Sequence, residues 1–306
     1  PHPGGEVNRA RHCPQSPSLV ATRPASKVAY VFDIAKAAEE GPSQTPWLTL
    51  RGHGDEGFGC AWSPHVNGQL TTCANDGTIC GWDIATAKGG GITPTYFASR
   101  GESAVADVQY SPQCPFTICA AGDDKALVFW DLRTQGDKCS QVVENAHDGD
   151  INALAYPTFG EDDQFRLLSA SADRTVKLWD TNQQMSTQTI PAHDFEVLSC
   201  DWNKYNPNLL VTASVDKTIK CWDIRNPSME LTILHGHTYA VRRVRCSPHQ
   251  QGVIASCSYD MTMRMWDMES PNSQLQCFEH HTEFTVGCDF NSCLLYTSDA
   301  ADDRVS

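Results

Sequence analysis

Histidine, serine or threonine, aspartate and tryptophan recur together at four places in the chain. The imidazole, hydroxyl and carboxylate of such a set could transfer protons or act as nucleophiles in catalysis. An active site is a single constellation, whereas this set recurs, so we predict a structural role. The sets are His53, Thr72, Asp76 and Trp82; His147, Ser169, Asp173 and Trp179; His193, Thr212, Asp216 and Trp222; and His237, Ser256, Asp260 and Trp266.

Each set lies on a short pattern that predicts two antiparallel strands joined by a tight turn. The clearest copy is Leu209–Asp223, where apolar or small residues lead to a polar turn at Asp216 and then to an alternating run that closes on Trp222-Asp223. Further copies are Leu168–Asp180 and Ile254–Asp267, with weaker ones at Thr71–Asp83 and Cys119–Asp131.

The pattern has a regular period. The units close on Asp33, Asp83, Asp131, Asp180, Asp223 and Asp267, at successive intervals of 50, 48, 49, 43 and 44 residues. A period of roughly 40–50 residues, with four short strands and a Trp-Asp ending, resembles the WD40-repeat β-propeller. We therefore expect an all-β propeller of six complete blades over residues 6–280, plus the first strand of an incomplete seventh that opens at His281.

The resemblance also implies how the recurring polar set is used. In this repeat type the His, the Ser or Thr, the turn Asp and the Trp form a buried hydrogen-bond chain within one blade. The third unit lacks the His and has Ala120 where Ser or Thr is expected. We expect it to be the least stable complete blade after the first.

The chain divides into three parts. Residues 1–5 predict a ragged N-terminus, residues 6–292 the propeller, and residues 293–306 a disordered tail. Val7–Asp33 predicts the first three strands of the first blade.

The last residues do not continue the repeat. The tail resembles translated sequencing-library adapter, so we expect a truncated reading frame, with a fusion of two transcripts near residues 181–188 as one origin. The alternative is a genuine but divergent protein. An open ring predicts that hydrogen exchange finds the first unit and residues 281–306 unprotected, because a missing blade removes packing partners at both ends.

Composition fits one large β domain with a protein or peptide partner. Hydrophobic residues make up 40% of the 306 residues and charged residues 20%, with a formal net charge of −14. Acidity argues against direct contact with nucleic acid and favours a basic peptide or protein surface. Since no apolar run approaches the roughly 18 residues of a membrane span, we expect no membrane insertion.

The 14 cysteines predict core packing and no metal site. None are spaced as Cys-x-x-Cys, and Cys60, Cys200, Cys246 and Cys288 are expected at equivalent points of the first strand of their units. Known nucleotide, hydrolase and metalloprotease motifs are missing, and we interpret Gly89-Gly90-Gly91 as a flexible loop. We expect neither enzymatic activity nor a cofactor.

Residues 6–180 resemble the RbAp/MSI type of histone-binding chaperone. The stretches that carry this resemblance are Glu6–Arg11, Pro14-Gln15, Val31–Asp33, Leu50–His53, Glu56–Gly59, Asp76–Cys80 and Asp123-Asp124.

Residues 188–290 resemble a different family more closely, the peroxin-seven receptors for the type-two peroxisomal targeting signal. The stretches that carry this resemblance are Ile190–Tyr205, Gly236–Val244, Ala255–Asp260 and His280–Phe284.

The two resemblances imply two functions. The closer one implies a cytoplasmic receptor that cycles to the peroxisome and binds, with a co-receptor, a short signal peptide with basic and apolar residues on its cargo proteins. The other implies a nuclear subunit of chromatin assembly or modifying complexes that binds histones. Both partners are basic, so net charge does not separate them, and we rank the receptor first.

Candidate cargo-binding residues follow from the propeller geometry. Residues just after each opening His, and just before each turn Asp, are expected on the face that propellers commonly use for ligands. Aromatic side chains there would supply contact area and carboxylates would supply charge-assisted hydrogen bonds. The candidates are Asp194, Glu196, Val215, Tyr239, Tyr259 and Glu283. For Asp194 we favour the alternative of a solvated loop charge, and for Glu196 and Glu283 we leave both open.

Overall fold

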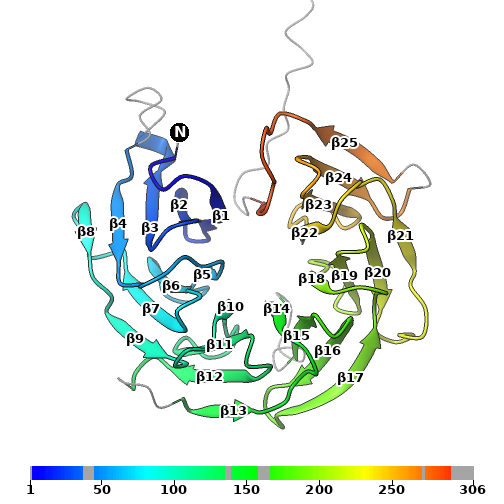
Figure 1. Cartoon of the computed structure of the whole chain (residues 1–306), viewed down its shortest axis with the longest axis horizontal. Coiled ribbons are helices and arrows are strands. Elements are labelled where there is room, and N and C mark those ends of the chain that lie inside the picture. Colours follow the sequence, from blue (N-terminus) through cyan, green and yellow to red (C-terminus); the bar gives the residue numbers. More distant parts are fainter. Residues whose placement is uncertain (1, 37–44, 135–138, 158–165, 271–272, 291–306) are drawn as a thin grey trace, which may run out of the picture.

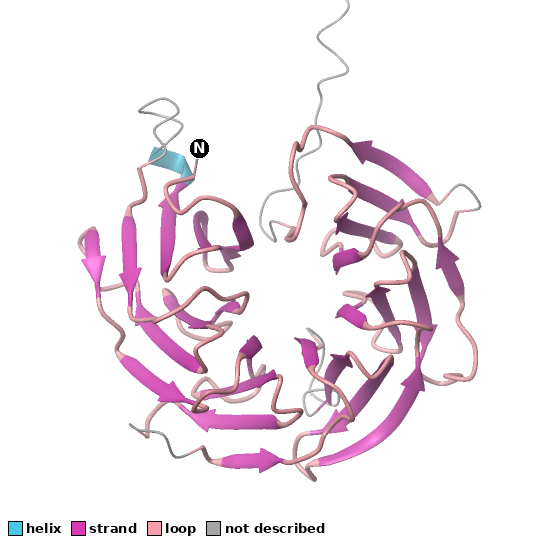
Figure 2. Cartoon of the chain, in the orientation of Figure 1, coloured by secondary structure: helices cyan, strands magenta, loops and turns pink. Residues whose placement is uncertain are grey.

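The computed structural model describes residues 2–36, 45–134, 139–157, 166–270 and 273–290. The predicted tail, residues 293–306, lies outside this part of the chain. The described residues form six β-sheets that follow one another in chain order around a central axis (Figure 1). Figure 2 shows strands and loops nearly throughout, with one short helical turn at Ile34–Lys36. The all-β propeller of six blades is confirmed.

Each sheet is a blade whose first strand lies nearest the axis. Blade 1 consists of β1 (Val7–Cys13), β2 (Ser16–Pro24), β3 (Val28–Asp33) and β4 (Leu48–Arg51). Blade 2 consists of β5 (Cys60–Trp62), β6 (Gln69–Cys73), β7 (Thr78–Asp83) and β9 (Tyr96–Ser99). Blades 3 and 4 consist of β10 (Val105–Tyr110), β11 (Thr117–Gly122), β12 (Leu127–Asp131) and β13 (Gln141–Val143), and of β14 (Ile151–Ala155), β15 (Arg166–Ser171), β16 (Thr175–Asp180) and β17 (Met185–Pro191). Blades 5 and 6 consist of β18 (Val197–Trp202), β19 (Leu209–Ser214), β20 (Ile219–Asp223) and β21 (Thr232–Leu234), and of β22 (Val241–Cys246), β23 (Val253–Ser258), β24 (Met263–Asp267) and β25 (Gln274–Phe278).

The hairpin between the second and third strands has the same turn in successive blades. In blade 5 the backbone N–H of Thr218 donates to Asp216 Oδ1 at 2.9 Å, and Lys217 between them has a φ of 73°. The Asp side chain closes the turn and so offsets the strain of a left-handed residue. The equivalent residue also has a positive φ in blades 2, 3, 4 and 6, where it is Gly77, Lys125, Arg174 and Met261.

The predicted strands of blade 1 are confirmed, but one prediction nearby is wrong. Gly90–Ile92 is a strand, β8, that pairs in parallel with β4 in the register Leu48 to Gly90, whereas we interpreted these glycines as a flexible loop. Gly89 and Gly90 have φ values of 98° and 88°, which glycine adopts without a Cβ clash. The parallel partner lies about 40 residues away in sequence, so local periodicity does not reveal it.

The predicted first strand of a seventh blade is absent from the described residues. Residues 281–290 are irregular and lie between blades 6 and 1, where the ring of blades is open (Figure 1). Thr285 Oγ1 donates to the carbonyl of Ser258 in β23 at 2.7 Å, and Asp289 pairs with Arg11 in β1 at 2.9 Å. The segment is therefore held on both neighbouring blades by side-chain contacts and by one backbone bond, from the Thr285 N–H to the Ser258 carbonyl at 3.3 Å, without a strand ladder.

Apolar cores lie between neighbouring blades. One of them joins Ile79 of blade 2 to Val108 and Trp130 of blade 3. In blade 6 every residue of β23 is buried, because the sheet is packed on both faces. Each described cysteine is a free thiol.

The predicted equivalence of four cysteines is only partly correct. Cys60 and Cys200 lie directly opposite the Thr of their own polar sets. Cys246 lies two residues beyond that position, which Val244 occupies, and Cys288 lies in the irregular segment. Cys60 and Cys200 follow their opening His by seven residues, whereas Cys246 follows His237 by nine, so a shared residue type did not fix a shared register.

Candidate functional site

The recurring polar set forms a complete hydrogen-bond chain in blades 4, 5 and 6. In blade 4, His147 Nδ1 lies 2.8 Å from Asp173 Oδ2 and His147 Nε2 lies 2.7 Å from Ser169 Oγ. Trp179 Nε1 donates to the same Ser169 Oγ at 2.7 Å. Since the carboxylate accepts, His147 Nδ1 is the donor to Asp173, and the Ser169 hydroxyl links the imidazole to the Trp179 indole.

Blades 5 and 6 repeat this geometry closely. The His–Asp, His–hydroxyl and Trp–hydroxyl distances are 2.7, 2.8 and 3.0 Å in blade 5 and 2.8, 2.7 and 2.8 Å in blade 6. Burial would raise the pKa of Asp216, but hydrogen bonds from His193 and Thr218 outweigh it and hold that pKa at about 2. The pKa of Asp260 is held at about 2 in the same way.

Blade 2 departs from the predicted chain. His53 Nε2 bonds Thr72 Oγ1 at 2.7 Å and Trp82 Nε1 donates to that oxygen at 2.9 Å, as expected. His53 Nδ1, however, lies 2.6 Å from Thr78 Oγ1, and it is Thr78 that donates to Asp76 at 2.6 Å. The predicted contact of His53 with Asp76 is thus relayed through a threonine. Burial, followed by the nearby Arg23, lowers the pKa of His53 to about 3.

Blade 3 replaces the chain with an ion pair. Arg100 Nε donates to Asp124 Oδ2 at 2.8 Å, and a second guanidinium nitrogen contacts the same oxygen. Asp124 lies at the turn position that Asp173 occupies in blade 4. Ala120 offers no hydroxyl, and Trp130 Nε1 is buried with no hydrogen-bond partner. Blade 3 therefore contains an uncompensated polar group, which costs stability.

Blade 1 has a partial chain that the sequence analysis missed. His2 Nε2 lies 3.0 Å from Thr22 Oγ1, and the His2 ring packs on Phe32, which stands in the Trp position. Gly5 donates to the carbonyl of His2 at 3.0 Å, so residues 2–5 form turns, where we expected a ragged start. The signal was a His 20 residues before a Thr, close to the 19-residue spacing of three other sets.

These chains have the properties of structural elements. The side chains of His147 and His193 have no exposed area and that of His237 has 1%. A general base must reach its substrate, and these rings are already bonded on both nitrogens. Among the described residues no group of three His, Cys, Asp or Glu side chains is arranged to hold a metal ion. No helix in the described ranges is long and apolar enough to cross a membrane.

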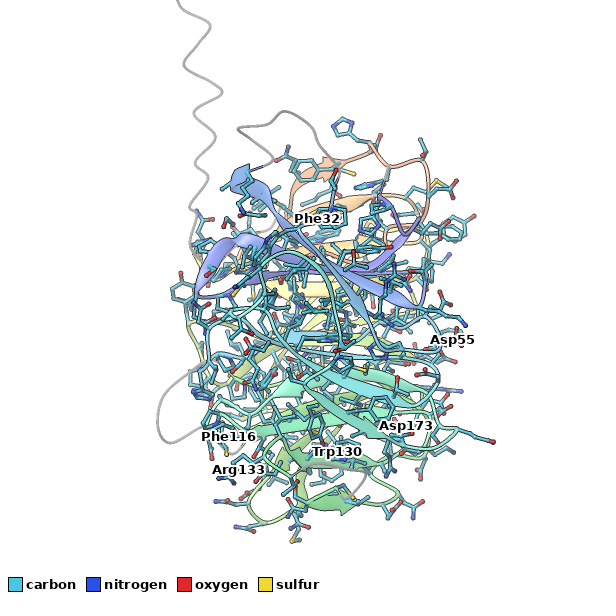
Figure 3. All side chains as sticks on the ribbon, turned by 90° about the vertical axis from the view of Figure 1, so that its left-hand side faces the viewer. Phe32, Asp55, Phe116, Trp130, Arg133 and Asp173 are labelled. Carbon is cyan, nitrogen blue, oxygen red and sulfur yellow. The ribbon has the colours of Figure 1, made fainter. Side chains whose placement is uncertain are left out.

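The exposed charges are concentrated on one face of the ring, which we call the acidic face. It consists of the segments that lead into the inner strands and of the hairpin turns between second and third strands. In the edge-on view of Figure 3, Asp55 and Asp173 mark this face, while Phe116 and Arg133 mark the opposite one. Among the described residues its exposed carboxylates are Glu6, Asp55, Glu102, Asp123, Glu144, Asp148, Asp150, Asp194, Glu196, Glu279 and Glu283, and its exposed basic residues are Lys27, Arg174 and Lys217.

All six candidate cargo-binding residues belong to this face, in two groups. Asp194 and Val215 line a cavity of about 490 Å³ at the edge of blade 5, together with Lys217 and Lys220. The lysines make this cavity a poor place for a basic ligand side chain.

The second group lies at blade 6 and at the start of blade 5. The Tyr259 ring lies 5.2 Å from that of Phe284, which follows the exposed Glu283. Tyr239 is 62% exposed on the same blade, and Glu196 is exposed at the start of blade 5.

Three phenylalanines on this face were missed. Phe195 and Phe284 are 57% and 60% exposed, which is unusual for large apolar side chains unless they contact a partner. Phe58 stacks against the Arg242 guanidinium at 4.9 Å. Phe195 lies two residues after its opening His, as Tyr239 does, so the spacing that selected Tyr239 also identifies Phe195.

Comparison with known families agrees with the fold. The family model described as "WD domain, G-beta repeat" matches residues 44–83, 137–180, 184–223 and 228–267, which together make up more than half of the chain. Each matched stretch contains one of the four His–hydroxyl–Trp chains. WD40 propellers typically serve as non-enzymatic scaffolds that bind proteins. The chain therefore belongs to the WD domain, G-beta repeat family.

Proposed function

We propose that the acidic face binds a short peptide with basic and apolar side chains, and that this peptide is the type-two peroxisomal targeting signal of cargo proteins. The observation that carries the proposal is the combination, among the described residues, of eleven exposed carboxylates and several exposed aromatic rings on one face. Carboxylates form strong charge-assisted hydrogen bonds with Lys and Arg, and aromatic rings supply apolar contact area.

The choice of this peptide rests on blades 5 and 6 and their closer resemblance to the peroxin-seven family. There Glu196 and Glu283 are exposed, while Phe195, Tyr239 and Phe284 offer rings for apolar anchors. A receptor of this kind works in the cytoplasm with a co-receptor and cycles to the peroxisome, and we extend that localisation to this chain as part of the proposal.

A histone segment is the second candidate, favoured by one observation. The exposed carboxylates continue over blades 2, 3 and 4 at Asp55, Glu102, Asp123, Asp148 and Asp150. These blades belong to the part of the chain that resembles histone-binding chaperones, and histone tails are rich in Lys and Arg.

Fluorescence anisotropy with labelled peptides separates the two candidates. The whole chain is titrated with a type-two signal peptide, with histone H3 and H4 tail peptides, and with a scrambled peptide of the same charge as the signal peptide. We expect the signal peptide to bind more tightly than the scrambled one. Tighter binding of the histone tails would support the second candidate, and equal binding of all peptides would contradict both.

A further inference from the structure

A cavity lies at the end of the central channel opposite the acidic face. It has a volume of about 500 Å³ and is lined by the last residues of the inner strands, together with the segment at Asp289. The inner strands end there because they run from the acidic face toward the other face of the ring. A volume of this size is within the range of small-molecule sites.

Three cations point into this cavity against two carboxylates. Arg11 Nη1 pairs with Asp289 Oδ1 at 2.9 Å, and Lys204 Nζ donates to Asp201 Oδ1 at 2.9 Å. Arg245 reaches Asp201 Oδ1 at 3.4 Å. Arg11 Nη2 and Arg245 Nε are buried and have no hydrogen-bond partner, although Arg245 Nε lies 3.7 Å from Asp289 Oδ1. The cations therefore have donors left over after the carboxylates are paired.

A second layer of charge lies further along the channel. Arg9 of β1 pairs with Asp107 of β10, and Arg243 of β22 lies 3.8 Å from the other oxygen of Asp107. The Arg243 side chain is 2% exposed, and Nε, Nη1 and Nη2 all lack a hydrogen-bond partner.

Both layers together carry an excess of positive charge. Five cations face three carboxylates, an excess of two in a chain whose net charge is −14. Unpaired buried charge is costly, so an anion in the cavity would stabilise the ring.

We propose that the cavity binds a small organic phosphate monoester, with the phosphate held by Arg11, Lys204 and Arg245. A guanidinium presents two parallel N–H donors that match the oxygens of a phosphate, and a lysine adds a point charge. The other walls include Trp62, Tyr156 and the segment at Phe290, which suit a flat or apolar body attached to the phosphate. This site is at the opposite end of the channel from the peptide face, so it stands independently of the proposed function.

Isothermal titration calorimetry tests the proposal with three probes: phenyl phosphate, inorganic phosphate and benzoate. We expect saturable one-to-one binding in the order phenyl phosphate, inorganic phosphate, benzoate. Lys204→Met and Arg245→Gln should each weaken phenyl phosphate binding by about 10- to 100-fold, because each removes a charge-assisted hydrogen bond. The matched control is Arg225→Gln, which removes an exposed arginine that pairs with Asp223 outside the cavity and should leave the affinity unchanged.

Each other outcome overturns a stated part of the proposal. No saturable binding of any probe, or an affinity unchanged in both cavity variants, removes the site. Benzoate equal to phenyl phosphate removes the phosphate class, and inorganic phosphate equal to or tighter than phenyl phosphate removes the organic body. If Arg245→Gln does not fold, the result for Lys204→Met decides. The Lys204 side chain is 18% exposed, and Arg245 still pairs with Asp201 in that variant, so we expect it to fold.

Discussion

Replacing Ala120 with serine should stabilise the protein, because it supplies the acceptor that Trp130 lacks. Ala120 lies opposite Val128, as Ser169 lies opposite Lys177 in blade 4, where Trp179 Nε1 donates to Ser169 at 2.7 Å. A gap too narrow for a water molecule is lined by Ala120, Val128 and Arg100, so the serine hydroxyl must fit against these side chains. A net hydrogen bond contributes about 0.5–1.5 kcal/mol, which for a chain of this length raises the Tm by about 1–3 °C.

The assay is urea and thermal unfolding of Ala120→Ser in two backgrounds, the natural chain and Trp130→Phe. Phenylalanine has no N–H, so the added hydroxyl gains no donor from the ring there and should give no stabilisation. The difference between the backgrounds measures the coupling of the introduced serine hydroxyl to the indole N–H. Equal effects in both backgrounds, or a lower stability of Ala120→Ser alone, would refute the claim that the orphaned indole weakens blade 3.

The remaining predictions concern the hydrogen-bond chains and the ends of the ring. Ser169→Ala should cost about 1–3 kcal/mol in urea unfolding, since it leaves two buried partners unsatisfied, and a cost near zero would contradict the chain's structural role. Acid should destabilise the fold. In the unfolded chain His53 takes up a proton below pH 6.5, whereas in the folded ring it does so only near pH 3, so the free energy of unfolding falls between these values. Asp216 adds a further loss of stability between pH 3.8 and about 2. A Tm that stays flat from pH 6.5 to about 4 would contradict this, and His53→Gln should flatten the slope. Hydrogen exchange should be fast over residues 281–290 except at Thr285, whose N–H bonds the carbonyl of Ser258; slow exchange across that whole segment would contradict an irregular conformation.

Local patterns predicted the blades because their information lies within about 30 residues. In Leu209–Asp223 the alternation, the turn Asp and the closing Trp-Asp specify one hairpin, and the structure has it at β19 and β20. The complete chains of blades 4, 5 and 6 follow from the same spacing.

Features that depart from the repeat pattern or that depend on several blades were not predictable in this way. In blade 3 an ion pair between Arg100 and Asp124 takes the place of the His–Asp contact, and an arginine there is not part of the repeat pattern. Arg9, Asp107 and Arg243 meet because three inner strands surround one axis, although they lie more than 90 residues apart from one another. Residues 281–290 form no strand because a strand's backbone requires a hydrogen-bonded neighbour along its length, and side-chain contacts with one backbone bond at Thr285 hold them instead.

The most direct test of peptide binding at the acidic face is a charge-reversal experiment. The test variant combines Glu196→Arg with Glu283→Arg, and its affinity for the peptide is measured by fluorescence anisotropy. The control variant combines Glu230→Arg with Glu269→Arg. These two carboxylates lie on connections between third and fourth strands, at the opposite face. Reversal against a basic ligand side chain should cost about 2–5 kcal/mol where the contact is desolvated. We predict that the first variant no longer binds the type-two signal peptide while the second binds it as the natural chain does. Unchanged affinity in the first variant, with an unaltered melting curve, would contradict the proposed site.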